Sequence, residues 1–449
     1  MGEVNVPANR YYGAQTERSR TNFPIGVGNE PMPREIIHAF SLLKAACAEA
    51  NARLLSERMT EEKKNAIVAA CKEIEEGRLD EHFPLVVWQT GSGTQSNMNV
   101  NEVISGWARE NAGVELHAND DVNMSQSSND TFPSAMYIAA VLALGERVIP
   151  AAERLAGALA LLEKENEGVL KCGRTHLQDA TPLSFSQEIS GWRRGIEENV
   201  AALKGAIAPL CELAIGGTAV GTGLNAPKGF GDLVAAALKQ KTGYPFKSAE
   251  NKFYALGGKS AAVLAHGALK ALAADLMKIA NDVRWLASGP RTGLGEIFIP
   301  ENEPGSSIMP GKINPTQCEA MTMVAVQVMG NDTAVGFAAA SGNFELNVFM
   351  PLIAYNLLQS ARLLAEGMDS FRERCVEGIR PNREKMAENL SRSLMLVTAL
   401  TPRIGYERAA AVAKLAHKEN LSLKEAALAL GVLTEDELDE CLRPENMLS

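Results

Sequence analysis

A loop in the second half of the chain, PGSSIMPGKINPTQCE at residues 304–319, gathers several side chains that could take part in chemistry. It places the hydroxyl of Ser306 in the same short segment as the amine of Lys312, the amide of Asn314 and the carboxylate of Glu319. The prolines and glycines between them argue against a continuous helix, because proline lacks an N–H group and glycine adopts conformations that other residues avoid. A plain surface loop does not explain this set of groups, so the segment is a candidate functional site.

The end of this loop is expected to lead directly into a helix. Pro315 suits the first helical position, which makes Asn314 the natural N-cap and places Lys312 beside the positive end of the helix. Glu319 then falls in the second turn, from which it could reach back toward the loop or across to another helix.

A second polar segment, TGSGTQSNMNVNE at residues 90–102, carries hydroxyls on a glycine-framed turn. Ser92, Gly93 and Thr94 precede a polar helix start, where serine and threonine often do no more than cap the helix. The functional alternative is an anion site built from hydroxyls and backbone amides. That alternative gains weight if other polar segments converge on the same place.

The segment HANDDVNMSQSSNDTFP, residues 117–133, ends where a long helix is expected to begin. Ser127, Ser128 and Asn129 precede that helix, whose unpaired N–H groups and dipole attract negative charge. Capping accounts for one of the three, and three successive small polar residues are more than a cap requires. His117, taken alone, is most simply a solvated loop histidine.

A histidine in the segment GRTHLQDATP, residues 173–182, is a candidate for proton transfer. His176 lies between two expected helices and is flanked by Arg174, Thr175 and Gln178. A single histidine is more often structural than catalytic, but its imidazole exchanges protons near neutral pH with little tuning. Both interpretations stay open on the residues alone.

The elements that must position these segments are expected to be long helices. Apolar residues recur every three or four positions through 186–214 and 258–287, as at the seam between helices of a bundle or coiled coil. Similar helices are expected at about 132–166, 315–340 and 350–375. The pattern therefore predicts a mainly α protein with five long helices at its centre.

Two prolines and one glycine-rich stretch refine this picture. Pro133 suits the first turn of the first long helix, and Pro150 is expected to kink it. The stretch 213–231 could form a pair of strands or, equally well, a loop in close contact with its neighbours.

The character of the sequence changes on either side of the long helices. We expect an N-terminal domain at 1–126, a central helical-bundle domain at 127–379 and a small C-terminal domain at 380–449. Long helices with alanine-rich faces would leave apolar surface uncovered in a monomer, so the pattern also predicts an oligomer.

The overall composition is that of a soluble globular protein of 449 residues, with 46% hydrophobic and 22% charged residues. The net charge of −10 and the lack of a long basic run argue against a nucleic acid or an anionic membrane as partner. The longest apolar runs, such as Ala135–Leu144, are about half the length that a membrane span needs. An anionic substrate would have to be held by local cations and amides.

The cysteines give no sign of a metal site or a disulfide framework. Seven are scattered along the chain without a C-x-x-C pair, which favours reduced thiols in the cytoplasm over a structural zinc site. The N-terminal residues 1–13 lack the apolar core of a signal peptide. No phosphate-binding glycine motif follows a strand-like run, so the sequence predicts neither a metal nor a nucleotide cofactor.

The four polar segments together resemble the signature regions of the fumarase/aspartase superfamily, whose members add or eliminate a group across the double bond of fumarate. GSSIMPGKINP is similar to the signature loop, and the other three segments occur in matching order. TGSGTQSNMN and KINPTQCEA resemble in particular the class II, iron-independent fumarases, and the resemblance covers nearly the whole chain. It implies a three-domain subunit with a central five-helix bundle, and a homotetramer whose bundles form a twenty-helix core.

The resemblance also implies the reaction, which is the reversible hydration of fumarate to (S)-malate without a cofactor, at sites that each draw on three subunits. Ser306 would be the base that removes a proton from carbon, and His176 would move a proton to or from the hydroxyl group or the attacking water. Glu319 would pair with His176 and raise its basicity. The substrate carboxylates would be held by further residues of the four segments, which are Ser92, Gly93, Thr94, Ser127, Ser128, Asn129, Thr175, Ser307, Lys312, Ile313 and Asn314.

The start of the second of these segments resembles a further feature of fumarases, a second and non-catalytic site for a dicarboxylate. The matching residues are His117, Ala118, Asn119 and Asp120. The family usually has a proline where this chain has Ala118, so the loop is expected to be less rigid here.

Three other functions remain open. An aspartate ammonia-lyase would share most of these groups, although such enzymes typically have alanines in the first loop. The tripeptide Ala340–Ser341–Gly342 matches the one that cyclises into an electrophile in histidine ammonia-lyase-type enzymes, but it follows an expected helix where a turn is normal. A helical scaffold with vestigial lyase groups would have no reason to keep Ser306, His176, Lys312, Asn314 and Glu319 together.

Overall fold

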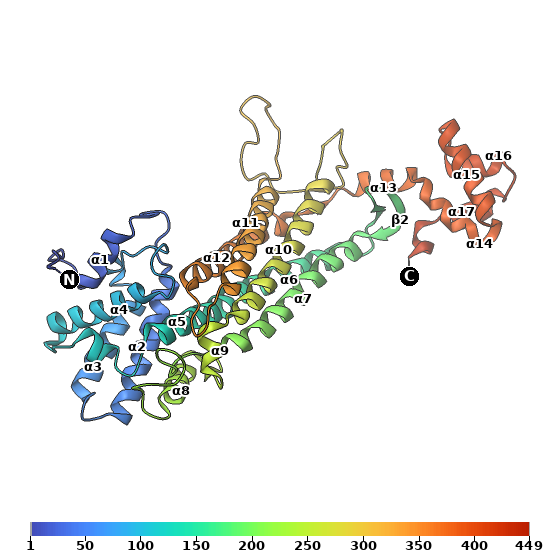
Figure 1. Cartoon of the computed structure of the whole chain (residues 1–449). Coiled ribbons are helices and arrows are strands. Elements are labelled where there is room, and N and C mark those ends of the chain that lie inside the picture. Colours follow the sequence, from blue (N-terminus) through green and yellow to red (C-terminus); the bar gives the residue numbers. More distant parts are fainter. Residues whose placement is uncertain (1, 449) are drawn as a thin grey trace. The chain divides into compact units, whose positions relative to one another are not determined.

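The computed structural model describes residues 2–448, which are mainly α-helical, as the sequence predicts (Figure 1). The α-helices are α1 (Ala14–Asn22), α2 (Arg34–Leu54), α3 (Glu61–Glu75), α4 (Thr94–Trp107), α5 (Ser128–Ala143), α6 (Ile149–Glu165), α7 (Phe185–Leu210), α8 (Phe230–Thr242), α9 (Lys252–Gly257), α10 (Ser260–Leu286), α11 (Thr316–Ala340), α12 (Met350–Arg374), α13 (Arg383–Arg392), α14 (Thr401–Ile404), α15 (Tyr406–Glu419), α16 (Leu423–Ala429) and α17 (Glu435–Cys441). Short 3₁₀ or π turns are η1 (Asp80–His82), η2 (Ala108–Ala112), η3 (Ala118–Val122), η4 (Leu144–Val148), η5 (Val376–Gly378), η6 (Leu394–Leu400) and η7 (Pro444–Met447).

Within residues 2–448 the β structure consists of three short ladders and two isolated bridges. Antiparallel pairs join β1 (Leu170–Thr175) to β2 (Gln178–Ser184) and β5 (Ile297–Phe298) to β6 (Arg380–Pro381), and a parallel pair joins β3 (Glu212–Leu213) to β4 (Lys247–Ser248).

The five long helices that the apolar periodicity predicts are all present. The first of them is one continuous helical segment, Ser128–Glu165, made of α5, η4 and α6. The irregularity expected at Pro150 takes the form of the π turn η4, which ends just before it. Pro150 has no N–H group to donate to the preceding turn, and a wider turn is one way to accommodate that loss.

The glycine-rich stretch 213–231 does not form the pair of strands that was one of its two possible structures. Only Leu213 pairs within it, with Ser248 of β4; residues 214–229 form a loop, and Phe230 and Gly231 begin α8. Gly216 has φ +92°, and a Cβ atom there would lie 3.1 Å from the Cα of Gly231. The close-contact loop is therefore the correct alternative, because a side chain at Gly216 would be both strained and crowded.

The chain forms two compact units, whose boundaries fall inside long helices. The first comprises residues 1–151, 199–273 and 324–366, and the second comprises 152–198, 274–323 and 367–449. This division does not test the expected three domains, which stay a prediction.

The first unit is built around α2, which packs against α3, α5 and α8 (Figure 1). The apolar face of α2 is fully buried, with Ile36, Phe40 and Leu43 each at 0% exposure. A carboxylate fixes α1 to α4, because Glu102 accepts hydrogen bonds from the backbone N–H groups of Gly13 and Thr16 at the start of α1. The four unpaired N–H groups at a helix start need such partners.

The second unit contains α6, α13 to α17, the ladders β1–β2 and β5–β6, and the adjoining ends of the other long helices. The indole of Trp192 on α7 donates to Asp282 on α10 at 2.9 Å, and Arg154 on α6 forms an ion pair with Asp369 on α12. The C-terminal helices enclose a separate apolar cluster that includes Leu400.

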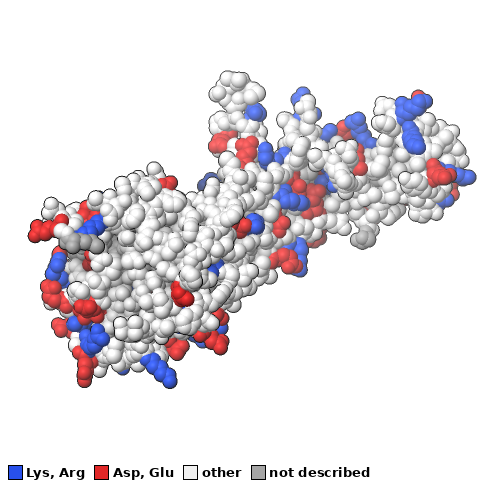
Figure 2. Space-filling model, viewed as in Figure 1, with Lys and Arg blue, Asp and Glu red and all other residues white. Residues whose placement is uncertain are grey.

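Two of the long helices, Ser128–Glu165 and Ser260–Leu286, are long and apolar enough to cross a membrane by length and composition alone. In the first, 72% of the most apolar window is buried within the chain, and in the second the share is 39%. Buried bundle helices meet the same criteria. On the face shown in Figure 2, acidic and basic side chains are interspersed.

Candidate active site

A pocket of about 560 Å³ opens in the first unit where three polar segments meet. Thr94 comes from the start of α4, Ser127 and Ser128 come from the start of α5, and Thr218 comes from the loop after β3. All the described residues that line the pocket are neutral, and they are Gln15, Thr94, Met98, Asn119, Asn123, Ser125, Gln126, Ser127, Ser128, Thr218, Ala219, Leu224 and Asn225. Two helix N-termini and several hydroxyl groups therefore face one space, which favours an anionic ligand.

The turn before α4 requires glycine for steric reasons. Gly93 is the N-cap of α4 with φ +73°, and a Cβ atom there would lie 2.0 Å from the ring of Phe132. On either side of it the hydroxyls of Ser92 and Thr94 are 2.8 Å apart and hydrogen-bonded. Neither oxygen is used as a helix cap, which leaves both with capacity for a ligand.

Capping explains only the first of the three polar residues at the start of α5. Ser127 is the N-cap, and its Oγ accepts from the backbone N–H of Asn129 at 3.2 Å. The Oγ of Ser128 instead accepts from the side-chain amide of Asn97 at 3.3 Å, and the side-chain amide of Asn129 donates to the carbonyl of Ala219 at 2.8 Å. Asn129 thus links the start of α5 to the loop that contains Ala219, which forms another wall of the pocket.

A buried carboxylate behind the pocket joins α5 to that wall. Asp130 is 0% exposed, and its carboxylate accepts from the backbone N–H groups of Ser127, Gly216 and Thr218 at 2.9 to 3.0 Å. Burial raises the pKa of Asp130 to about 6, against the three N–H groups, which favour its ionised form. The path of the 214–229 loop therefore depends on this side chain.

A buried cation lies beneath the same pocket. Lys44 is 0% exposed, and its Nζ donates to Asn123 Oδ1 at 3.0 Å and to Gln126 Oε1 at 2.9 Å. Asn123 Oδ1 also accepts from the side-chain amides of Asn97 at 3.1 Å and Asn101 at 3.2 Å. Burial lowers the pKa of Lys44 to about 8.

In the second unit, His176 lies between two helices, α6 and α7, as the sequence analysis expects, and it occupies the tip of a β-hairpin that the sequence analysis does not predict. Its flanks are strands β1 and β2, with Thr175 paired to Gln178. His176 and Leu177 form a two-residue turn in which both have positive φ, +56° and +59°, as in a type I′ turn. The sequence analysis missed the hairpin because the usual Asn-Gly turn signal is missing and the strands lack alternating apolar residues.

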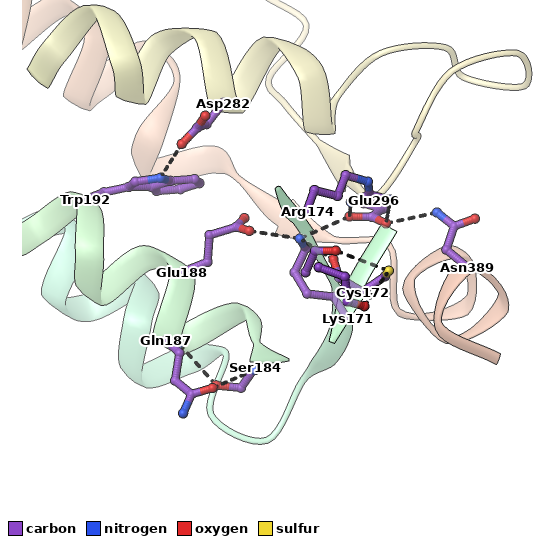
Figure 3. A network of polar contacts seen from close by, with 12 residues as sticks. Lys171, Cys172, Arg174, Ser184, Gln187, Glu188, Trp192, Asp282, Glu296 and Asn389 are labelled. Atoms are coloured by element: carbon purple, nitrogen blue, oxygen red, sulfur yellow. Dashed lines mark hydrogen bonds and ion pairs between the residues drawn. The ribbon is translucent and has the colours of Figure 1, made fainter. Parts of the chain in front are cut away.

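A network of buried charges anchors this hairpin (Figure 3). Arg174 donates two hydrogen bonds, of 2.9 and 2.6 Å, to Glu296, which is 0% exposed. Lys171 contacts both Glu296 and Glu188, and Asn389 of α13 donates to Glu296 at 2.9 Å. Burial acts to raise the pKa of Glu296, but Arg174 and Lys171 outweigh it, so that pKa lies below its usual value.

The loop between β5 and α11 extends away from the helices in Figure 1 and carries Ser306. The Oγ of Ser306 accepts from the backbone N–H groups of Ile308 at 3.3 Å and Met309 at 3.2 Å. The side-chain amide of Asn314 donates to the carbonyl of Gly305 and closes the base of the loop. The first helical hydrogen bond of α11 runs from the N–H of Glu319 to the carbonyl of Pro315 at 3.1 Å, so Pro315 and not Asn314 occupies the cap position, and α11 begins one residue later than expected, at Thr316.

The other predicted site residues of the second unit are exposed. These are Thr175, His176, Ser307, Lys312, Ile313 and Glu319. Among residues 2–448 of one subunit, no hydrogen bond or ion pair joins His176 to Glu319. One subunit by itself does not assemble the predicted catalytic pair.

The predicted second dicarboxylate site lies at the start of η3. His117 Nδ1 accepts from the backbone N–H of Asp120 at 3.1 Å, and Ala118 is the first residue of the turn. Asn119 lines the 560 Å³ pocket. Over the described range 2–448, no group of three or more His, Cys, Asp or Glu side chains is placed to hold a metal ion.

The sequence analysis missed four residues of this site, namely Lys44, Asn123, Asp130 and Thr218. A lysine in the middle of the apolar run of α2 was a usable signal, because an unpaired charge is costly to bury. No local sequence pattern points to Thr218, because the feature that distinguishes it is its positive φ of +55° in the folded chain.

Comparison with known proteins was made at the level of sequence and of structure. A family model described as a lyase matches residues 2–330, and one described as the fumarase C C-terminus matches residues 396–449. Class II fumarate hydratases of Bacillus subtilis and Staphylococcus aureus are each 58% identical over 453 residues, covering 100% of this chain and 97% of theirs. A crystal structure of a class II fumarase from Schistosoma mansoni gives a TM-score of 0.96 at 44% identity, covering 99% of this chain and 97% of that one.

Proposed function

We propose, because the chain belongs to the class II fumarases of the fumarase/aspartase superfamily, that it catalyses the reversible hydration of fumarate to (S)-malate. Relatives named fumarate hydratase class II match it over its full length. The membership predicts the substrate, a small dicarboxylate, and the pocket of neutral hydroxyls and helix N-termini is suited to bind one.

The reaction places two demands on the protein. In the direction of fumarate, a base must take a proton from the carbon next to a carboxylate, which is a very weak acid. The product of that step is a doubly charged aci-carboxylate, so the site must stabilise charge that appears only along the reaction path.

Ser306 is the proposed base, and the two backbone N–H groups that point at its oxygen are the observation that carries the proposal. Hydrogen bonds from Ile308 and Met309 favour an anionic oxygen over a neutral hydroxyl. Lys312 of the same loop adds a positive charge. Closure of the loop over the substrate would expel water and strengthen these interactions.

His176 and Glu319 are proposed to serve the other half of the reaction. His176 would move a proton to or from the C2 hydroxyl or the attacking water, and Glu319 would orient it and raise its basicity. Because these two side chains do not meet within one subunit, we assign them to different subunits of the assembly.

Both substrate carboxylates are proposed to be held by residues from the four polar segments. Lys312 and Asn314, with Ser307 and Ile313 beside them, would hold one carboxylate. The second would be held by the residues around the pocket in the first unit and by the hairpin, namely Ser92, Gly93, Thr94, Ser127, Ser128, Asn129 and Thr175.

A homotetramer with a twenty-helix core is the proposed assembly, and α11 supports it. Apolar side chains lie on both its buried and its exposed faces, with Met321 and Val328 buried while Met323 and Phe337 are 67% and 76% exposed in one subunit. Large apolar side chains exposed along a helix are normally covered by a partner. We further propose that the enzyme is cytoplasmic and needs no nucleic acid, membrane or cofactor.

The second dicarboxylate site is proposed at His117, Ala118, Asn119 and Asp120. The Nδ1 atom of His117 lies 2.9 Å from a carboxylate oxygen of Asp120, and both side chains are largely exposed. A dicarboxylate bound there would compete with Asp120 for the imidazole, so we expect this site to be weaker than the catalytic one.

The test is an assay of purified, chelator-treated protein with fumarate, (S)-malate and aspartate as separate substrates. Absorbance of the fumarate double bond should fall with fumarate and rise with (S)-malate, and aspartate should give no change. Release of ammonia from aspartate at a comparable rate would instead establish an aspartate ammonia-lyase.

The cyclised electrophile of histidine ammonia-lyase-type enzymes receives no support from the structure. Ala340 is the last residue of α11, and the hydroxyl of Ser341 donates to the carbonyl of Phe337 at 2.8 Å. This is an ordinary contact for a serine at a helix end. A mass lower by two waters on the intact chain would revive that alternative.

A further inference from the structure

The wall of the pocket opposite α4 contains a hydroxyl whose place in the structure calls for an explanation. Thr218 lines the pocket and is 4% exposed. Its Oγ1 is buried, and no group among residues 2–448 donates to it or accepts from it. A buried hydroxyl without a partner costs free energy, so buried hydroxyls in folded proteins are almost always hydrogen-bonded.

The backbone at Thr218 is also in an unfavourable conformation. Its φ of +55° lies in the left-handed region, where a β-branched residue is rare. Gly216 and Gly217 stand directly before it, so the chain uses glycine freely in this loop. A glycine or asparagine at position 218 would relieve the strain, and threonine there implies that its side chain has a use.

The surroundings hold this threonine firmly in place. Its backbone N–H donates to the buried carboxylate of Asp130 at 2.9 Å, and the next residue, Ala219, accepts from the side chain of Asn129 at 2.8 Å. Both anchors come from the start of α5, which also supplies Ser127 and Ser128 to the pocket. A strained conformation persists only where neighbours enforce it in this way.

We infer that Thr218 is a substrate-binding residue whose hydroxyl donates a hydrogen bond to a carboxylate oxygen of the dicarboxylate. This rests on the proposed function, which supplies the ligand class. Asp130 is then a positioning residue, which acts on the substrate only through the backbone of Thr218. The hydroxyls of Thr94, Ser128 and Thr218 would surround one carboxylate from three different segments.

The test compares Thr218→Val, which removes the hydroxyl and keeps the shape, with Thr218→Ser, which keeps the hydroxyl. Each variant is assayed as the full-length assembled enzyme for KM and kcat with fumarate, and for binding of succinate, an unreactive dicarboxylate. Thr218→Val should raise KM and the succinate Kd about tenfold or more, as for loss of a hydrogen bond to a charged group. Thr218→Ser should restore binding to within about threefold of wild type.

Melting temperature distinguishes binding from a structural role. Removing a hydroxyl without a protein partner should leave the melting temperature of ligand-free Thr218→Val unchanged or slightly higher. Thr16→Val is the matched control, because the buried hydroxyl of Thr16 donates to Glu102 at 2.7 Å and lies outside the pocket. That variant should melt lower and keep the wild-type KM.

Two results would overturn the inference. One is wild-type KM and succinate affinity in Thr218→Val, and the other is a fall in its melting temperature as large as that of Thr16→Val. Failure of the proposed function is a separate outcome, because wild-type enzyme would then not convert fumarate, whereas succinate binding to the variants could still be compared.

Discussion

His176 combines two properties that the hairpin tip requires. Its φ of +56° is unfavourable for most residues, and histidine tolerates the left-handed region better than most. Its side chain is exposed at the tip of β1 and β2. The buried contacts of Arg174 with Glu296 fix the strand immediately before the turn.

Replacement of His176 by asparagine removes the exposed imidazole but keeps a residue that tolerates the positive φ of the turn. Asparagine accepts positive φ, so His176→Asn should leave the hairpin and the melting temperature nearly unchanged while lowering kcat by about 10² to 10⁴. Leu177→Asn is the matched control, since it changes the other residue of the same turn. Steady-state kinetics and thermal melting check both variants, and a wild-type rate in His176→Asn would remove this residue from the mechanism.

Lys44 provides a test of the buried charge beneath the pocket. Its pKa is lowered from 10.5 to about 8 because burial disfavours the ammonium, although Cys47 and Asp130 act in the opposite direction. Between about pH 8 and pH 10.5 the unfolded chain therefore binds a proton that the folded chain has released, and folding stability rises with pH. The gain is on the order of 3 kcal/mol across that window.

Lys44→Met should abolish this gain. The melting temperature of the wild type should increase relative to Lys44→Met as the pH is raised through that window, because groups that do not interact with Lys44 titrate alike in both proteins and cancel in the difference. The neighbouring thiol of Cys71, on α3, has a pKa raised to about 12 and is common to both proteins. Parallel melting curves across the window would show that Lys44 stays charged in the folded protein.

At the scale of elements, the long helices were predictable and the hairpin was not. A helix such as α7 or α10 repeats its apolar positions over many turns, so the sequence contains the same signal many times. The hairpin depends on the buried contact of Arg174 with Glu296, which also accepts a hydrogen bond from Asn389, and both partners are far away in the sequence. No local pattern records such contacts.

The same difference applies to the site. Polar residues beside helix starts, such as Thr94 and Ser128, were recognisable because helix N-termini attract anions. Lys44 and Thr218 contribute through burial and backbone strain, and both are properties of the folded chain. The sequence thus predicts groups that act through local structure and misses groups that act through packing.

The start of α4 gives a prediction at this scale. Gly93→Ala should place a methyl group against the ring of Phe132 at a positive φ, so the turn that carries Ser92 and Thr94 would have to move. We expect a loss of about 2 kcal/mol or more in stability and a strong loss of activity. Gly113→Ala is the control, since Gly113 has a similar φ of +65° and open space around it, and it should cost only about 1 kcal/mol. Equal melting temperatures for the two variants would contradict this account.

At the scale of the whole molecule, the proposal that different subunits supply Ser306 and His176 to one site gives a prediction. Ser306→Ala and His176→Asn should each give a folded, assembled and nearly inactive protein. If Ser306 and His176 of one site come from different subunits, co-expression of the two variants should produce some sites in which both residues are intact. Activity of the mixed preparation, compared with each variant alone, checks this, and no recovery would place both residues in one subunit.

The side-chain oxygen of Asn123 accepts hydrogen bonds from Lys44, Asn97 and Asn101, and this arrangement restricts which substitutions evolution can tolerate here. Three donors from two helices share one acceptor, so replacement of Asn123 leaves all three to find new partners inside a packed interior. Over the divergence of related lineages a replacement of Asn123 should therefore be rare unless the three donors change with it.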